Sequence, residues 1–151
     1  MSTPKSTFVY VTYIRTTPEK LWQALTQPEF TRQFFMDCVH ESEWKVGASW
    51  KIAAPDGTIP DSGEVLEIDP PKRLVLRWRS ELKPELTAEG DSRMTYTLEP
   101  QGEMVKFTVL HEMDRDESKL IQAVSRGWPL ILSSLKSLLE TGASLEETRS
   151  W

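Results

Sequence analysis

Apolar and polar positions alternate with a period of about two through much of the chain and switch to a helical period near its end. Residues Phe8–Arg15 are rich in β-branched and aromatic side chains, which predicts a strand. Between residues 39 and 113 the same alternation is interrupted by short turn sequences such as Asp56-Gly57. We therefore expect an antiparallel meander of six further strands, at Val39–Trp44, Ser49–Ala54, Gly63–Ile68, Leu74–Glu81, Arg93–Glu99 and Met104–His111. The polar stretch Lys83–Gly90 is expected to be a loop.

Two short helical segments are expected between the first two strands. Thr17 can cap a helix whose first position is Pro18, because a threonine hydroxyl accepts from the first turn and proline tolerates that position. A second short segment after Pro28 carries Phe34 and Phe35.

A long helix is expected over Asp116–Thr141. Asp114 or Asp116 would cap it, and Gly142 is a natural terminator. Its apolar residues recur at steps of three and four and form one face, made of Leu120, Val124, Trp128, Ile131, Leu135 and Leu138.

These elements predict an α+β fold in which a curved antiparallel sheet of about seven strands wraps around the long helix. The helix and the sheet each have an apolar face, and they bury these faces against each other. A sheet of this size twists and curls, so a gap opens wherever its surface diverges from the helix. Such a gap is the default ligand pocket.

Composition and charge narrow the class of protein. The 151 residues suit one domain, and the net charge of −5 does not favour nucleic acid as a partner. No apolar run is long enough for a membrane span, and the polar start lacks a signal core, so no membrane partner is expected. The single cysteine, Cys38, excludes an intrachain disulfide and fits a reducing cytoplasm.

Several short sequences, in this order, resemble the START-like or helix-grip (Bet v 1-like) superfamily. The closest resemblance is to the family related to the C-terminal domain of the activator of the Hsp90 ATPase. The sequences that carry it are Thr17–Thr26, Pro28-Glu29, Asp56–Thr58, Gly63–Leu74, Arg77-Trp78, Thr97–Pro100, Leu110–Glu112 and Gly127-Trp128. The resemblance covers about residues 8–140. It implies one helix-grip domain over residues 7–142, between tails at 1–6 and 143–151. We expect the C-terminal tail either to be frayed or to pack on a partner.

The resemblance also implies a small cavity protein. Eukaryotic cochaperones of this family carry an additional N-terminal domain, for which this chain has no room, so Hsp90 is not an expected partner. Family members often carry paired tryptophans where this chain has Phe34-Phe35, a difference that removes two indole donors.

Strand phase predicts which side chains line the pocket, because the more apolar set on each strand should face the helix. A register slip of one residue would invert every set. Gly127 and Pro129 interrupt the helical pattern and should open space beside Trp128. The candidate pocket residues are Trp50, Ile52, Leu76, Trp78, Met94, Tyr96, Phe107, Val109, His111, Val124, Trp128, Ile131, Leu132 and Leu135.

His111 is the polar residue of most interest, because it continues the apolar set of its strand and should point inward. We interpret it as a core histidine bonded to a backbone carbonyl or to a hydroxyl such as that of Tyr96. In the alternative, His111 is a general base in the cavity.

Other catalytic and binding motifs are weak, and neither a metal nor a cofactor is expected. Cys38 and His40 do not have the spacing of a zinc pair. The sequence contains no nucleophile elbow and no glycine-rich phosphate loop. We interpret two pairs of carboxylates as solvated surface charge, namely Glu41/Glu43 and Glu64/Glu67. Glu64 and Glu67 are expected on opposite faces of their strand.

We predict a cavity protein that binds a small hydrophobic or aromatic molecule and has no catalytic machinery. One alternative is a cyclase- or hydrolase-like enzyme, which requires His111 to face the cavity with a second titratable group in reach. The other is a chaperone-associated or regulatory interaction module, or its simpler version, a homodimer. That alternative requires an exposed apolar patch around Phe34, Phe35 or Trp151.

Overall fold

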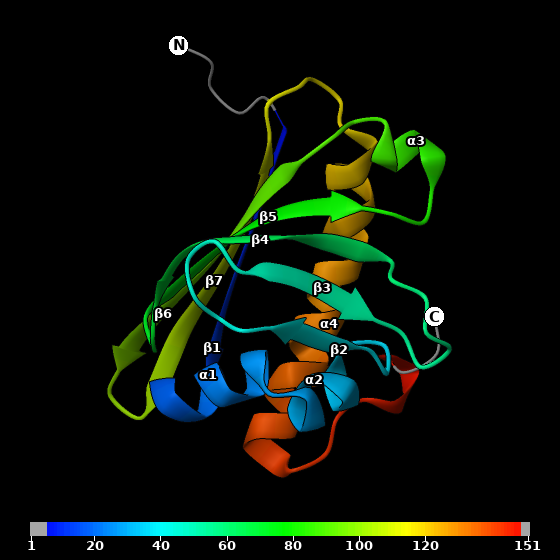
Figure 1. The fold of residues 1–151 in the computed structure, drawn as a ribbon. Coiled ribbons are helices and arrows are strands. Elements are labelled where there is room, and N and C mark those ends of the chain that lie inside the picture. Colours follow the sequence, from blue (N-terminus) through cyan, green and yellow to red (C-terminus); the bar gives the residue numbers. More distant parts are fainter. Residues whose placement is uncertain (1–5, 149–151) are drawn as a thin grey trace.

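Seven antiparallel strands form one curved sheet in the order β1-β7-β6-β5-β4-β3-β2 (Figure 1). The structure is a computed structural model, and it describes residues 6–148. The strands are β1 (Ser6–Ile14), β2 (Val39–Ser42), β3 (Ser49–Ala53), β4 (Asp61–Asp69), β5 (Arg73–Ser80), β6 (Ser92–Gln101) and β7 (Met104–Met113). The helices are α1 (Pro18–Thr26), α2 (Pro28–Phe34), α3 (Pro84–Thr87) and α4 (Lys119–Thr141), followed by the 3-10 helix Glu146–Thr148.

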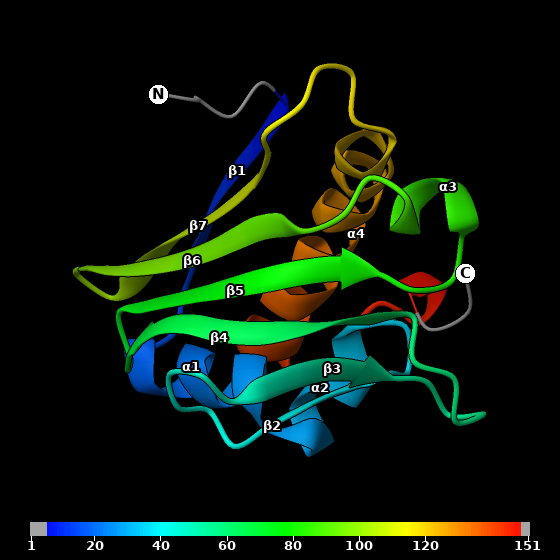
Figure 2. The same ribbon diagram turned by 45° about the horizontal axis from the view of Figure 1, so that its top comes forward.

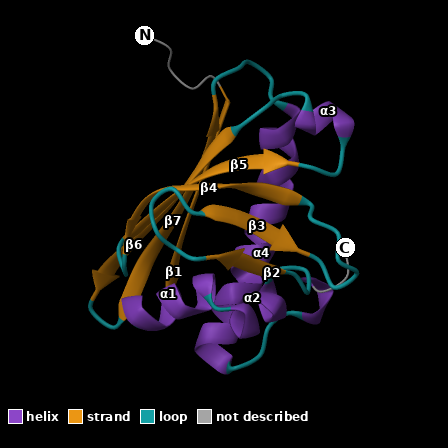
Figure 3. Cartoon of the chain, viewed as in Figure 1, coloured by secondary structure: helices purple, strands orange, loops and turns teal. Residues whose placement is uncertain are grey.

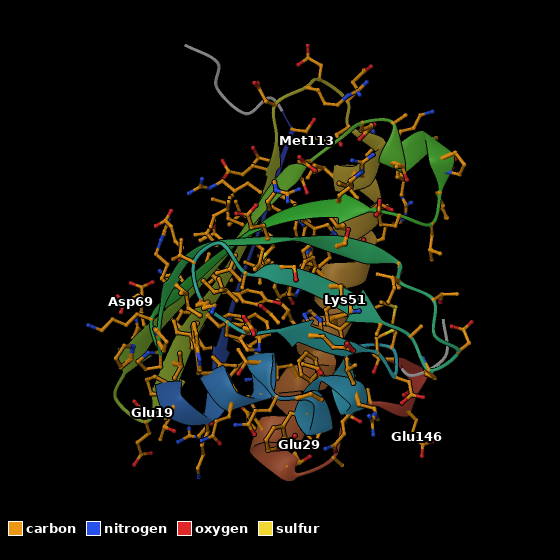
Figure 4. All side chains as sticks on the ribbon, in the orientation of Figure 1. Glu19, Glu29, Lys51, Asp69, Met113 and Glu146 are labelled. Carbon is orange, nitrogen blue, oxygen red and sulfur yellow. The ribbon has the colours of Figure 1, made fainter. Side chains whose placement is uncertain are left out.

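The long helix α4 crosses one face of the sheet, as the paired apolar faces predict. Helices α1 and α2 lie beside its C-terminal half, and α3 lies beside its N-terminal half (Figures 2 and 3). Side chains fill the space between the sheet and α4, whereas Glu19 and Glu29 project from α1 and α2 away from the sheet (Figure 4). Among residues 6–148, no helix combines the length and the apolar character needed to cross a membrane.

The predicted strand phases are confirmed by burial. Leu74, Leu76 and Trp78 on β5 are buried, and Arg77 between them reaches acidic side chains at the surface. On β7 the alternate residues from Val105 to His111 are fully buried. The alternation therefore predicted the buried set of these strands correctly.

A register shift between Val65 and Glu67 in β4 changes the predicted placement of Glu64 and Glu67. They were expected on opposite faces of the strand, but the irregularity adds a residue between them and both reach arginines of the outer face. Glu64 pairs with Arg77 at 3.3 Å, and Glu67 pairs with Arg93 at 2.8 Å. These ion pairs are partly exposed and contribute little to stability.

The expected loop Lys83–Gly90 contains the short helix α3. Pro84 occupies its first turn, and Leu86 is buried in a small apolar cluster with Leu120 and Ile121 of α4. Helix α3 was not predicted, because a single apolar residue in a polar stretch creates no period.

The N-terminal end of α4 differs from the prediction, and the C-terminal end agrees with it. Ser118, and neither Asp114 nor Asp116, caps the helix, and its hydroxyl accepts from the backbone N–H of Ile121 at 3.1 Å. Gly142 ends the helix in a left-handed conformation, as predicted.

The segment after α4 does not fray within the described residues. Thr148 is buried, and its hydroxyl lies 2.8 Å from that of Ser134 on α4. At the other end, Ser6 already belongs to β1. Residues 1–5 and 149–151, and with them Trp151 and most of the expected N-terminal tail, lie outside the described residues.

Candidate ligand cavity

A cavity of about 340 Å³ opens between α3, the N-terminal half of α4 and the end of β5. Most of its wall is apolar, and the polar lining residues are Asp61, Ser80 and Lys83. The apolar lining consists of Phe35, Met36, Trp78, Leu86, Leu120, Ala123, Val124, Gly127, Trp128 and Ile131.

Four of the fourteen predicted pocket residues line this cavity: Trp78, Val124, Trp128 and Ile131. The other ten lie in the core away from the cavity, where the sheet and α4 are in contact. They are Trp50, Ile52, Leu76, Met94, Tyr96, Phe107, Val109, His111, Leu132 and Leu135, and all are buried. Strand phase identifies the inner face of the sheet but not the part of it that α4 leaves uncovered.

Nine lining residues were not among the predicted pocket residues, for two different reasons. Leu120, Ala123 and Gly127 share the helical face of Val124 and Trp128, so the spacing on α4 could have identified them. The others come from the segment after α2, from the start of β4, from the end of β5 and from α3 with its N-cap, and they are Phe35, Met36, Asp61, Ser80, Lys83 and Leu86. Only the tertiary fold brings these segments together.

Asp61 places a carboxyl group in this largely apolar wall. Its Oδ1 accepts from the indole Nε1–H of Trp78 at 3.0 Å. Burial raises the pKa of Asp61 to about 6, the Trp78 hydrogen bond opposes the rise, and the charge of Glu81 adds to it. The carboxyl therefore loses its proton at about pH 6, whereas an ordinary aspartate does so at about pH 4.

Trp78 is the centre of an aromatic cluster that backs the cavity. Its ring centroid lies 4.5 Å from that of Trp50, 5.8 Å from that of Trp128 and 5.2 Å from that of His111. Tilted and edge-on contacts of this kind hold flat side chains in fixed orientations. The wall is therefore largely preformed.

His111 belongs to a continuous chain of hydrogen bonds behind this wall. Its Nδ1 accepts from Trp128 Nε1–H at 3.2 Å, so its Nε2 carries the proton toward the Ser92 hydroxyl at 2.8 Å. Ser92 in turn donates to the carbonyl of Trp78 at 2.9 Å. Burial lowers the pKa of His111 to about 3, so the ring is neutral.

The interpretation of His111 as a satisfied core histidine is confirmed, with Ser92 rather than Tyr96 as the hydroxyl partner. His111 is fully buried and does not line the cavity. Both ring nitrogens are engaged by Ser92 and Trp128, so the ring has no free nitrogen to act as a general base. The conditions of the enzyme alternative are not met at this residue.

His40 forms a similar pair with Trp50. Its Nδ1 accepts from Trp50 Nε1–H at 3.3 Å, while its buried Nε2 has no partner in the part of the chain that the structure describes. Burial lowers the pKa of His40 to about 3. No three His, Cys, Asp or Glu side chains within residues 6–148 gather closely enough to hold a metal ion.

Phe34 and Phe35 are buried, so they do not form the exposed apolar patch that the interaction-module alternative requires. Phe34 packs in the core, and Phe35 lines the cavity with its ring edge-on to His40. The chain reverses after Phe35 through two residues with positive φ, Met36 and Asp37, and this turn carries Met36 into the cavity wall.

Comparisons with known proteins agree with this architecture. The family model described as Activator of Hsp90 ATPase homolog 1-like protein matches residues 15–140. A solved protein from Mesorhizobium loti is 29% identical, with a TM-score of 0.75, over 89% of this chain and 96% of that one. Among curated proteins, none matches the chain.

Two further solved structures share the fold at lower identity. An Aha1 dimer from Colwellia psychrerythraea is 19% identical, with a TM-score of 0.73, over 90% of this chain and 97% of that one. An HSP90 activator from Plasmodium falciparum is 20% identical, with a TM-score of 0.72, over 89% of this chain and 96% of that one.

Proposed function

Since this chain belongs to the Activator of Hsp90 ATPase homolog 1-like family, we propose that it is a small-molecule-binding member of that family. The ligand is a hydrophobic or aromatic molecule, and it occupies the cavity between α3 and α4. One observation carries the proposal: apolar side chains and two preordered indoles, Trp78 and Trp128, surround a space of about 340 Å³. Small-molecule sites have volumes of roughly 300–1,000 Å³ and walls of this kind.

This proposal is tested by filling the cavity with a larger side chain and measuring the binding of an aromatic probe. Ala123→Phe places a ring in the space that Ala123 now borders, so we expect binding of 1-naphthalenemethanol, measured by calorimetry, to be lost. Ala143→Phe, at an exposed position after α4, is the matched control and should bind as the wild type does. No binding by the wild-type protein, or equal binding by both variants, would reject the cavity as the site.

We also propose self-association through β1, as a second candidate. β1 is an edge strand of nine residues without a charged side chain, and Val9, Val11 and Tyr13 are exposed on it. Lys136 donates to the Tyr13 carbonyl, so the backbone groups of Tyr13, and of Val11 and Val9 in the same alternation, point away from β7. Within residues 6–148, those of Val9 and Val11 have no hydrogen-bond partner on that side. Edge strands usually carry charges or bulges that prevent such pairing.

Sedimentation over a range of concentrations tests self-association. We expect a wild-type dimer that Val9→Lys converts to monomer. Val46→Lys, at an exposed apolar residue outside the sheet, should remain dimeric. A monomeric wild type would exclude the β1 dimer and would leave the cavity proposal intact.

Hsp90 activation and catalysis have less support as functions of this chain. Phe34 and Phe35, two of the three aromatic residues proposed for a partner surface, are buried, and His111 is engaged on both ring nitrogens. The free, buried Cys38 supports a location in the reducing cytoplasm.

A further inference from the structure

Within residues 6–148, Asp61 is the one residue with a carboxyl group that lines the cavity. Its side chain comes from the first residue of β4, paired in register with Ser80 of β5 and Ile52 of β3. This register holds the carboxyl beside the Trp78 indole, at the base of the apolar wall. The cavity therefore has a fixed polar end.

The Asp61 carboxylate at this polar end can accept more hydrogen bonds than it does. An ionised carboxylate offers about four lone-pair sites, and the Trp78 indole uses one of them on Oδ1. Among residues 6–148, no Lys, Arg or His side chain forms an ion pair with Asp61. A half-buried carboxylate without a cation is unfavourable, and a donor or cation supplied by a ligand would stabilise it.

The charges around Asp61 favour a cation over an anion. Glu81, which follows β5, raises the pKa of Asp61 and so adds negative potential. Cys38, which follows α2, is a neutral thiol, because burial and neighbouring carboxylates raise its pKa to about 11. Lys83 lines the cavity but is exposed, so water screens its charge.

We infer that the cavity selects hydrophobic or aromatic ligands that carry a hydrogen-bond donor, and above all a protonated amine, at the end that meets Asp61. The inference rests on the proposed small-molecule binding and adds the polar chemistry of the ligand to it. The apolar body of the ligand lies against Trp78, Trp128 and Val124. Its ammonium group donates to the free lone pairs of Asp61, and carboxylate ligands are rejected by like charge.

Three probes with the same ring system and different polar groups test this inference. They are 1-naphthylmethylamine as the cation, 1-naphthalenemethanol as the neutral donor and 1-naphthaleneacetate as the anion. At neutral pH we expect the amine to bind about tenfold more tightly than the alcohol. Both donate to the Asp61 carboxylate, but only the amine is itself charged, and a hydrogen bond between two charged groups is the stronger one. The acetate should bind more weakly than the alcohol.

The variant Asp61→Asn keeps an oxygen for the Trp78 donor and removes the charge, so the chain should still fold. In this variant we expect the amine and the alcohol to bind with equal affinity. Glu81→Gln is the matched control, since it removes a neighbouring charge that does not line the cavity, and it should keep the preference. Near-ultraviolet circular dichroism of each variant reports whether the aromatic cluster is intact.

A second measurement uses pH and does not depend on any variant. The affinity for the amine should fall as the pH drops through about 6, where Asp61 takes up its proton, and the affinity for the alcohol should fall much less, because a neutral hydroxyl can still form a hydrogen bond with the protonated carboxyl. If no probe binds, the proposed function fails together with this inference. If all three bind equally, or if folded Asp61→Asn keeps the preference for the amine, the cavity binds small molecules and the role of Asp61 is refuted.

Discussion

Gly63 shows how one residue controls the packing behind the cavity. A Cβ atom at this position would lie 1.6 Å from the backbone carbonyl oxygen of Arg77 on β5. Gly63 is paired in register with Trp50 on one side and with Trp78 on the other. Because Gly63 has no side chain, β4 can approach β5 closely at the point where the indoles of Trp50 and Trp78 are in contact.

Gly63→Ala should therefore destabilise the protein by about 2–3 kcal/mol, because backbone atoms would have to move apart to admit the methyl group. Urea unfolding monitored by tryptophan fluorescence measures the loss. A loss below about 0.5 kcal/mol, the range of ordinary surface substitutions, would contradict the close approach of the two strands.

Among the elements, α4 depends on a carboxylate from outside the helix. Glu89, in the connection after α3, accepts from the Ser118 hydroxyl at 2.7 Å and from the backbone N–H groups of Lys119 at 2.8 Å and Leu120 at 3.1 Å. A negative charge at this end of a helix is favourable. Burial raises the pKa of Glu89, but the three hydrogen bonds and the charge of Arg115 together outweigh it, and the pKa lies below its usual range. The contact also joins the α3 side of the cavity to α4.

Glu89→Gln should cost about 1–2 kcal/mol of stability, because an amide oxygen replaces a charged acceptor that serves several donors. Since the folded pKa of Glu89 is lowered, its stabilisation is present above the pKa of the unfolded carboxyl and is lost as the pH falls below it. The difference in unfolding free energy between wild type and variant should thus shrink in acid. A constant difference would show that the charge is not the cause.

Gly127 weakens the middle of the same helix, at the cavity wall. Glycine in a helix interior is less favourable than alanine by about 0.5–1 kcal/mol, and a Cβ atom here would meet nothing within 4 Å. Gly127→Ala should raise the unfolding free energy by about that amount, opposite in sign to Gly63→Ala. Urea unfolding of the two variants side by side tests both predictions, and destabilisation by Gly127→Ala would mean that the space beside Trp128 is filled.

At the scale of the whole molecule, the buried His40 and His111 and the half-buried Asp61 make stability depend on pH in mild acid. Burial lowers the pKa of His40 and of His111 to about 3, so between that pH and about 6.5 the unfolded chain binds two protons that the folded chain does not. Burial raises the pKa of Asp61 to about 6, so the folded chain holds one extra proton between about 3.8 and 6. The histidines outweigh the aspartate, and the net effect destabilises the folded chain as the pH falls.

The free energy of unfolding should thus decrease as the pH falls from about 6.5 to 4.5. The unfolded chain binds about one more proton than the folded chain in this range, so the decrease is at most about 1.4 kcal/mol per pH unit. Asp61→Asn should make this decrease steeper, because it removes the opposing group. His111→Gln should make it shallower, because one histidine no longer titrates. Urea midpoints across this range measure all three slopes, and a wild-type stability that rises on acidification would contradict the neutral, buried state of the histidines.

The sequence alone determined the strands, the long helix and the faces they bury, and its short family motifs pointed to the helix-grip fold. These features depend on neighbours along the chain. The alternation on β5 requires only that one side of the strand meets water, and the three- and four-residue steps on α4 require only one apolar side. The close approach at Gly63 and the bulge near Glu67 stayed hidden, because each depends on a neighbouring strand.

Only the tertiary structure decided where the cavity lies and what chemistry it has. Its walls come from Phe35, Asp61, Leu86 and α4, segments far apart in the sequence, and no local pattern records the distance between them. His111 illustrates the same limit. Its inward direction followed from the alternation, but its partners, Ser92 and Trp128, come from a neighbouring strand and from α4. Whether a buried polar group is free to react or satisfied is settled by such distant contacts, because hydrogen bonds form in space and not along the chain.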